Sequence, residues 1–345
     1  MIKQHRLLEL DTLRGLAALG VCLFHFSMIN PKGILSLKYF KYGCTGVDLF
    51  FMISGFVIFM SLGSSKSLKG FWFLRFNRLY PAYWLSIIVA IITLLCLSKY
   101  DISKQWNYIL GNFFMVQPLF KSINLVDAYW TLYVELCFYF FVSLVWFFKH
   151  LNKIEPIILS GLLVVLIVNG LYLLLENSSS GYVRFFIISR SIMPLVSYFG
   201  FFASGILYYK IYKEGWNIYR FMLLAFCFLL TILIHNISGR FNLFFGTFER
   251  VICLAFFNIL FVLIVNKKAG FLKVKWLLFI GTISYALYLI HESFGINVSA
   301  FLFDSIDKSL AIICGVITSI CAATLITFLF ERPIQKWLKK KYMPQ

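Results

Sequence analysis

The chain has 345 residues, of which 61% are hydrophobic and 13% are charged. Soluble domains carry about 25% charged residues, so this composition excludes an ordinary soluble globular protein. Long apolar runs recur from end to end, and no hydrophilic stretch is long enough for a separate soluble domain. We therefore predict an all-α, polytopic integral membrane protein that forms a single membrane domain over residues 1–345.

The net charge of +18 raises the question of nucleic-acid binding. The basic residues fall in short segments between the apolar runs, which is the distribution that sets membrane orientation. We therefore predict membrane lipids as partners and no nucleic acid. No two of the eight cysteines form a Cys-x-x-Cys pair, and most lie inside apolar runs. This pattern predicts neither a disulfide framework nor a metal site.

The apolar runs predict about ten transmembrane helices, near residues 12–29, 47–62, 79–97, 129–148, 157–175, 191–209, 217–235, 249–266, 276–294 and 309–329. With ten spans, both termini lie on the same side of the membrane. One side comprises the N-terminal segment with Arg14, the C-terminal tail and segments 63–78, 149–156, 210–220 and 267–275. That side holds 21 of the 32 Lys and Arg residues. The positive-inside rule therefore predicts that both termini are cytoplasmic.

Segment 106–120 is only moderately apolar, because Gly111, Asn112, Gln117 and Pro118 interrupt it. An eleventh span at this place would break the alternation of basic and less basic segments. We interpret the segment as a surface helix or a re-entrant piece, with a short span as the alternative.

The first span contains two ionisable residues, Arg14 and His25. Eleven helical residues correspond to a rise of about 16 Å, roughly half of the ~30 Å hydrocarbon core. With a cytoplasmic N-terminus, Arg14 lies near the inner surface and His25 lies near or just past the middle. An ionisable residue at that depth is costly and by default indicates function.

Two carboxylates can accompany His25. Span two begins with Gly46, Val47 and Asp48, and span four begins at Trp130 and carries Glu135. Both spans descend from the outer face, so the two carboxylates and His25 can share one depth. We predict that His25, Asp48 and Glu135 form an acid–base centre. The alternative is that each residue only hydrogen-bonds another helix.

Span nine carries a polar stripe along one helical face, formed by Gly281, Ser284, Tyr285, Tyr288, His291 and Glu292. Such a stripe should face the interior of the bundle or a cavity. His291 lies toward the outer face and suits a polar acceptor there. Close packing and interhelical hydrogen bonding explain the same stripe without a ligand.

The segment that enters span three carries Arg75 and Arg78, three residues apart, among aromatic residues that include Tyr80. Two forked cations beside aromatic rings suit a ligand that bears phosphate groups and a base. Anchoring by basic and aromatic residues at the inner surface is the alternative. Pro81 suits an early helical position or a turn.

Other basic residues are explained more simply. The tail from Glu331 to Lys341 is amphipathic and basic, which is typical of an interfacial anchor. Four arginines lie at or near the outer face, where ordinary surface placement fits better than acceptor binding: Arg184, Arg190, Arg240 and Arg250.

The order and spacing of these motifs, from Leu10 to the tail, resemble the membrane-bound acyltransferase-3 family of O-acyltransferases. The resemblance rests on Arg14 and His25 with ten residues between them, the Gly46–Phe51 run, Arg75-x-x-Arg78, Trp130-Thr131-Leu132 with Glu135, the run from Ser284-Tyr285 to His291, and Glu331-Arg332-Pro333.

The resemblance implies a ten-helix enzyme that moves an acyl group, usually acetyl, from coenzyme A to a carbohydrate hydroxyl. It implies that His25 is essential to transfer and that the arginines serve the donor. We accordingly assign donor binding to Arg14, Arg75, Arg78 and Tyr80, and acceptor binding to Trp130, Ser284, Tyr285 and His291. Acetyl-coenzyme A is then a donor substrate, the acceptor is a cell-envelope or lipid-linked carbohydrate, and the expected location is a bacterial cytoplasmic membrane.

We expect direct transfer, in which His25 removes the acceptor proton with help from Asp48 or Glu135. An acyl-enzyme route is the rival mechanism. A proton-coupled transporter or flippase of a glycan or lipid is the rival function, because intramembrane His, Asp and Glu also suit a proton relay. The sequence leaves open the acceptor, the acyl group and whether the chain forms a homo-oligomer.

Overall fold

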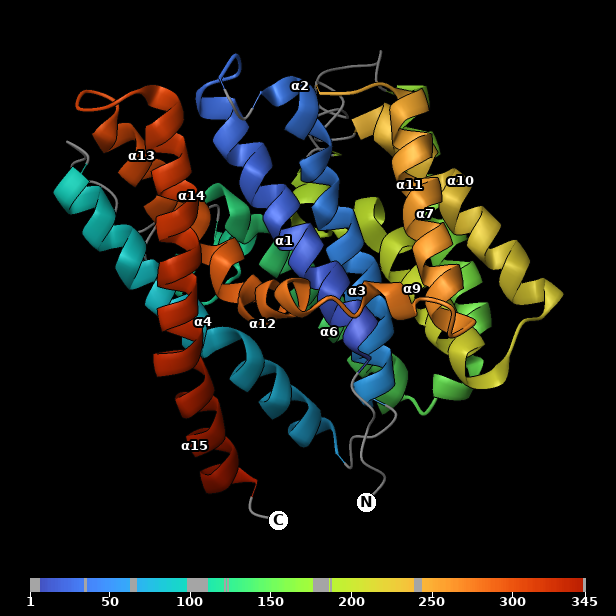
Figure 1. Cartoon of the computed structure of the whole chain (residues 1–345). Coiled ribbons are helices and arrows are strands. Elements are labelled where there is room, and N and C mark those ends of the chain that lie inside the picture. The colour runs from blue at the N-terminus through green and yellow to red at the C-terminus, as the bar shows by residue number, and fades with distance from the viewer. Residues whose placement is uncertain are drawn as a thin grey trace. The chain divides into compact units, whose positions relative to one another are not determined.

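The computed structural model describes residues 7–33, 36–62, 67–97, 111–120, 122, 124–175, 186, 188–238 and 244–343. Over these residues the chain forms helices and no strand (Figure 1). The predicted all-α class is therefore confirmed. Helices suit apolar segments in a bilayer because every backbone hydrogen bond is made within the segment.

The helices fall into two compact units, each assembled from separate stretches of chain. Unit 1 comprises Met1–Val47, Lys69–Trp130 and Gly270–Gln345, and unit 2 comprises Asp48–Leu68 and Thr131–Ala269. The long helices of unit 1 are α1 (Leu8–Ile29), α4 (Leu68–Leu97), α12 (Lys275–Ile290) and α14 (Lys308–Leu325). The long helices of unit 2 are α3 (Gly46–Leu62), α6 (Trp130–Phe147), α7 (Ile154–Leu175), α9 (Leu195–Glu214), α10 (Ile218–Ser238) and α11 (Thr247–Val265).

Shorter elements complete each unit. Unit 1 also contains α2 (Leu37–Phe40), α13 (Asn297–Leu302), α15 (Arg332–Tyr342), 3-10 turns at Lys41–Thr45, Gln117–Phe120, Asp127–Tyr129 and Gly270–Leu272, and π-helical segments at His291–Ile296 and Ile326–Glu331. Unit 2 contains a 3-10 turn at Leu151–Lys153.

Each of the predicted spans coincides with a described helix. Nine helical segments of the described chain are long and apolar enough to cross a membrane, so the multi-pass class is confirmed. The sixth predicted span, 191–209, corresponds to α9, which lies outside that set. Gly200, Ser204 and Gly205 interrupt the apolar character of α9, and its residues from Phe199 to Tyr208 are all buried. A helix that packs mainly against protein does not need an apolar surface all round.

The helix that contains span three begins before the predicted span. Helix α4 begins at Leu68 rather than near residue 79, so the segment predicted as a loop is helical, and Pro81 lies inside the helix. With 30 residues, α4 is about 45 Å long and exceeds the ~30 Å hydrocarbon core. Its first turns carry Arg75 and Arg78 on a rigid helix. Proline inside a long helix is tolerated in membrane proteins because neighbouring groups satisfy the freed backbone carbonyl.

The described part of segment 106–120 packs against α4. Residues 106–110 lie outside the described residues, and residues 111–120 form short helical turns. The Tyr83 hydroxyl donates to the Asn112 carbonyl oxygen and accepts a hydrogen bond of 3.1 Å from Gln117 Nε2. Polar contacts therefore anchor residues 111–120 to α4, and the surface or re-entrant placement of the segment stays a prediction.

Helix α14 continues through a π-helical segment into α15, and the three pieces form one long rod (Figure 1). The tail is therefore a helical extension of span ten. Helix α15 lies against the first part of α4, where Asn77 Nδ2 donates to the Gln335 carbonyl oxygen over 3.2 Å. The rings of Phe73 and Tyr342 lie 5.9 Å apart.

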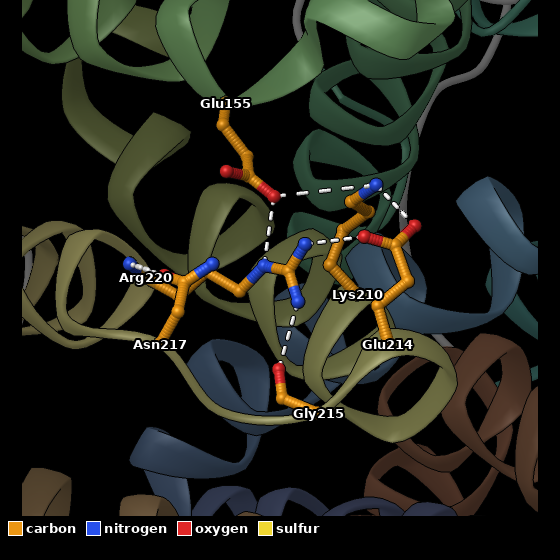
Figure 2. Close-up of polar contacts among 6 residues, drawn as sticks. All are labelled: Glu155, Lys210, Glu214, Gly215, Asn217 and Arg220. Atoms are coloured by element: carbon orange, nitrogen blue, oxygen red, sulfur yellow. Dashed lines mark hydrogen bonds and ion pairs between the residues drawn. The ribbon is translucent and has the colours of Figure 1, made fainter.

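An ion network joins three helices of unit 2 in segments that we predict to be cytoplasmic. Figure 2 shows Arg220 of α10 between Glu155 of α7 and Glu214 of α9. The Arg220 Nε donates to Glu155 over 2.8 Å and its Nη1 donates to the Gly215 carbonyl oxygen over 2.7 Å. Lys210 also pairs with Glu214. The hydrogen bond from Lys210, together with the charges of Lys210 and Arg220, lowers the pKa of Glu214.

We expect Arg220→Ala to destabilise the protein. Arg220 is 7% exposed, and its removal leaves Glu155 and Glu214 with Lys210 as their remaining shared cation. The expected loss is about 1–3 kcal/mol, less than when a buried charge loses its last partner. Thermal unfolding of the purified protein in lipid nanodiscs measures the loss. Lys213→Ala, at an exposed position of α9, is the matched control and should change stability by less than about 0.5 kcal/mol.

The stability difference between wild type and Arg220→Ala should also depend on pH. Because the pKa of Glu214 is lowered in the folded protein, its ion pairs contribute fully above the ordinary value of 4.5. The contribution is lost as the pH falls through the lowered value. The difference between wild type and Arg220→Ala should therefore shrink in strong acid; a difference that grows there would contradict the network.

Candidate active site

Helices α1 and α12 approach each other closely at two glycines. A Cβ atom on Gly15 would lie 2.6 Å from the Leu277 carbonyl oxygen and 2.7 Å from the Gly281 nitrogen. A Cβ atom on Gly281 would collide with the carbonyl of Asp11. Thr12 Oγ1 adds a hydrogen bond of 2.7 Å to the Leu272 carbonyl oxygen. Small residues at this crossing let the two backbones touch, as is common between membrane helices.

This crossing sets the register that brings two histidines together. His25 lies ten residues after Gly15, and His291 lies ten residues after Gly281, so both pairs share one sequence offset of 266 residues. The His25 Nδ1 and His291 Nε2 atoms are 2.9 Å apart, and the ring centroids are 5.0 Å apart. His25 is half-buried, whereas His291 is completely buried. The sequence predicted both residues as site residues but did not predict their contact.

Helix α12 also holds the arginine of α4 that we assigned to the donor. The Arg78 guanidinium lies over the Tyr285 ring at 5.4 Å from its centroid, and Arg78 Nη1 pairs with Glu331 Oε1 at 3.3 Å. The Tyr285 hydroxyl donates to the Leu79 carbonyl oxygen over 2.9 Å. Tyr285 precedes His291 by six residues, a rise of about 9 Å. One helix therefore holds Arg78 and the histidine pair at a fixed separation.

The other predicted donor residues lie on α1 and α4 of unit 1. Arg14 directly precedes the Gly15 crossing, with its Nη1 3.9 Å from Asp11 Oδ1. The Arg75 guanidinium lies over the Phe71 ring at 5.3 Å. The Tyr80 hydroxyl donates to the Phe114 carbonyl oxygen over 3.1 Å. Because α4 is helical from Leu68 onward, it holds the side chains of Arg75, Arg78 and Tyr80 in fixed relative positions.

The remaining stripe of α12 organises the turn before α6. The Tyr288 hydroxyl donates to the Ala128 carbonyl oxygen over 3.1 Å, and the Ala128 nitrogen donates to Glu292 Oε2 over 3.0 Å. The backbone carbonyl oxygen and nitrogen of Ala128 are therefore hydrogen-bonded to side chains of α12 and of the π-helical segment that follows it. Ala128 lies two residues before the half-buried Trp130. Ser284 is 2% exposed and donates to the Gly281 carbonyl oxygen within its own helix.

Asp48 has a charged partner inside unit 2. It pairs with Arg250 of α11, and both side chains are almost completely buried, at 2% and 4% exposure. The Arg250 guanidinium also lies over the Phe201 ring at 5.4 Å. The interpretation of Arg250 as an ordinary surface residue is therefore wrong, because a buried cation needs a counter-ion and Asp48 supplies it. Arg190 is held by the Asn169 side chain over 2.7 Å, whereas Arg184 and Arg240 lie outside the described residues.

Glu135 is half-buried in unit 2 and accepts two hydrogen bonds from hydroxyl groups. Ser54 donates to it over 3.2 Å and Tyr139 donates over 2.7 Å. The roles of Asp48 and Glu135 as acid–base partners of His25 stay predictions. Among the residues that the structure describes, no group of three or more His, Cys, Asp or Glu side chains is arranged to hold a metal ion.

The fold and these contacts define a multi-pass helical membrane protein in which His25 contacts His291 and Arg78 of α4 lies over Tyr285 of α12. Residues 7–330 match the family model described as an acyltransferase domain, Acyl_transf_3. The chain therefore belongs to the acyltransferase-3 family, and the protein is an acyltransferase. The resemblance inferred from the sequence motifs is confirmed.

Three relatives illustrate the range of the family. The protein named "Putative acetyltransferase ORF330" of Acidianus two-tailed virus is 23% identical over 281 residues, 81% of this chain and 80% of that protein. The peptidoglycan O-acetyltransferase OatA of Listeria monocytogenes is 29% identical over 149 residues, and the acyltransferase MdmB of Streptomyces mycarofaciens is 27% identical over 145 residues.

These last two matches are partial. The OatA match spans 38% of this chain and 22% of OatA, and the MdmB match spans 39% of this chain and 38% of MdmB. No solved structure matches the chain.

The close contact between α1 and α12 at Gly15 can be tested by substituting this residue. Gly15→Ala should destabilise the protein by about 1–3 kcal/mol, because the added methyl group forces two backbones apart. Gly20→Ala is the matched control on the same helix, since its Cβ would lie 3.5 Å from Gly43 Cα, an ordinary contact. Thermal unfolding in nanodiscs compares the two. Equal melting temperatures for both variants would show that the crossing does not constrain α1.

Proposed function

We propose that this protein is a membrane O-acetyltransferase that moves an acetyl group from cytoplasmic acetyl-coenzyme A to a hydroxyl of a cell-envelope or lipid-linked carbohydrate. The observation that carries the proposal is the arrangement on α12 and the π-helical segment that continues it, where Tyr285 contacts Arg78 and His291 contacts His25. A group that binds anions and a base inside the membrane are thereby set about 9 Å apart along one helix.

The donor has the shape that this arrangement requires. Coenzyme A is long and carries its phosphates at one end and its thioester at the other. Arg75, Arg78 and Arg14 would hold the phosphates at the inner face, since guanidinium groups pair with phosphate in a forked geometry. Tyr80 would pack against the nucleotide. The pantetheine arm would then run along α12 toward His25.

The chemistry needs one base near the thioester. His25 removes the proton from the acceptor hydroxyl, and the oxygen attacks the carbonyl carbon of the thioester. A carbon–oxygen bond forms, the carbon–sulfur bond breaks, and the proton passes from His25 to the leaving thiolate. The products are an O-acetyl ester and free coenzyme A. Asp48 or Glu135 would assist His25 in this scheme.

The acceptor would approach from the opposite membrane face. Trp130 stands at the start of α6, beside the turn that Tyr288 and Glu292 hold, and an indole ring suits stacking against a sugar. Ser284 and Tyr285, predicted as acceptor residues, precede His291 by seven and six residues, and the contact of Tyr285 with Arg78 favours the donor side for them. Relatives named as peptidoglycan or other O-acetyltransferases favour a carbohydrate acceptor, and a bacterial cytoplasmic membrane is the location that we propose.

The deciding experiment uses the full chain in nanodiscs with acetyl-coenzyme A that carries a labelled acetyl group. Release of free thiol together with label in an added envelope glycan, absent with boiled protein, would support the proposal. Movement of a glycan or lipid across proteoliposomes without thiol release would overturn it in favour of a transporter. Transfer of label to the protein before the acceptor is added would support the acyl-enzyme route instead of direct transfer.

We expect His25→Ala to abolish turnover while the protein still folds, because the base is removed from a half-buried position. The loss should be at least about 10²-fold in kcat, the usual contribution of a general base. The control is His150→Ala, at an exposed histidine, which should retain wild-type kcat. Unchanged acetyl transfer by His25→Ala would exclude this histidine as the base.

The arginines should act on donor binding. Arg75→Ala and Arg78→Ala are expected to raise KM for acetyl-coenzyme A by about 10-fold or more, since each hydrogen bond between charged groups contributes about 1.5–3 kcal/mol. Arg332→Ala is the matched control, an arginine held over the Phe328 ring at 4.5 Å. Initial-rate kinetics separate KM from kcat. A fall in kcat at constant KM would place these arginines outside the donor site.

A further inference from the structure

The protonation of His291 follows from its partners. His291 Nδ1 lies 2.8 Å from the Tyr288 carbonyl oxygen and 3.2 Å from the Leu287 carbonyl oxygen. Carbonyl oxygens only accept hydrogen bonds, so Nδ1 must carry a proton. In a neutral histidine only one ring nitrogen carries a proton, so a hydrogen bond that fixes the proton on one nitrogen leaves the other nitrogen as an acceptor.

The protonation of His25 follows in turn. A neutral His291 with a proton on Nδ1 has only a lone pair at Nε2, and this atom lies 2.9 Å from His25 Nδ1. His25 Nδ1 must therefore donate, and its own lone pair is at Nε2. A cationic His291 would reverse the direction, but its ring is 0% exposed, and no carboxylate of the described residues forms an ion pair with it. A buried charge in that situation is costly. The geometry thus selects one tautomer for each ring.

Packing around the pair holds this arrangement. His291 begins the π-helical segment His291–Ile296, and π-helical turns inside helices occur frequently at functional sites. A Cβ atom on Gly295 of this segment would lie 2.8 Å from the Phe26 ring and 3.0 Å from the Gly315 carbonyl oxygen of α14. Phe26, the neighbour of His25, is completely buried. The end of α1, the π-helical segment and α14 therefore pack tightly at Phe26 and Gly295, next to the segments that carry the two rings.

We infer that His291 is the positioning residue of the active site: it fixes His25 with the proton on Nδ1 and the basic lone pair on Nε2. In hydrolase triads a carboxylate has this role. A neutral imidazole achieves the same orientation without placing an uncompensated anion in the membrane interior. The inference rests on the proposed function, in which His25 is the base, and it gives His291 a role different from acceptor binding.

The first test measures the tautomers directly and needs no turnover. The chain is labelled with ¹⁵N-histidine, reconstituted in lipid, and the ring nitrogens are observed by solid-state NMR, with His25→Gln and His291→Gln used for assignment. We expect His25 and His291 both to be protonated on Nδ1 and not on Nε2. A His25 ring that carries its proton on Nε2 would overturn the inference even if the protein is an acetyltransferase.

The second test separates positioning from packing in the acetyl-transfer assay. His291→Phe keeps a ring of similar size but removes the acceptor, and we expect kcat to fall by about 10²–10⁴-fold with KM for acetyl-coenzyme A unchanged. His291→Gln restores an acceptor near the position of Nε2 and should recover most of that loss. His235→Gln, at another buried histidine, is the control and should keep wild-type kcat.

The outcomes distinguish the two proposals. Equal losses in His291→Phe and His291→Gln, or a change confined to KM, would overturn the positioning role. Full activity in His25→Ala would instead overturn the proposed function, and the NMR result would still report whether His291 sets the tautomer of His25.

Discussion

The contact between the backbones of α1 and α12 is the constraint on which the site of unit 1 depends. At Gly15 and Gly281 there is no room for a methyl group, so the two helices are held in one register. Ten residues farther along, about 15 Å by helical rise, the same register places His25 against His291. In a bilayer the hydrophobic effect does not drive helices together, so close packing of small residues has to do so.

The three side chains predicted to form the acid–base centre each have specific partners inside the apolar helices. His25 pairs with His291, Asp48 pairs with Arg250, and Glu135 accepts from two hydroxyl groups. An unpaired polar group in the hydrocarbon region costs several kcal/mol, so each partner limits the positions that its helix can adopt. Such a pair can stabilise the fold and also position a reactive group, and only a measurement of the reaction distinguishes these two roles.

Helix length also matters for the site. Helix α4 continues beyond the predicted inner surface and carries Arg75 and Arg78 on its first turns, while α15 extends span ten beside it. The arginines proposed to bind the donor are therefore presented by a rigid element. Glu331, almost completely buried, orients Arg78 from the π-helical segment that precedes α15. Preorganised cations lose less entropy when they bind a phosphate than cations on a mobile loop.

The sequence by itself determined the membrane class, the positions of the helices and the family, because long apolar runs and motif order are local properties of the chain. It also predicted His25, Arg78 and His291 as site residues. Only the tertiary structure decided that His291 contacts His25 and that Arg250 contacts Asp48, since these pairs are 266 and 202 residues apart. Helical periodicity states which face a residue occupies but not which helix that face meets, and that choice is made by packing between helices.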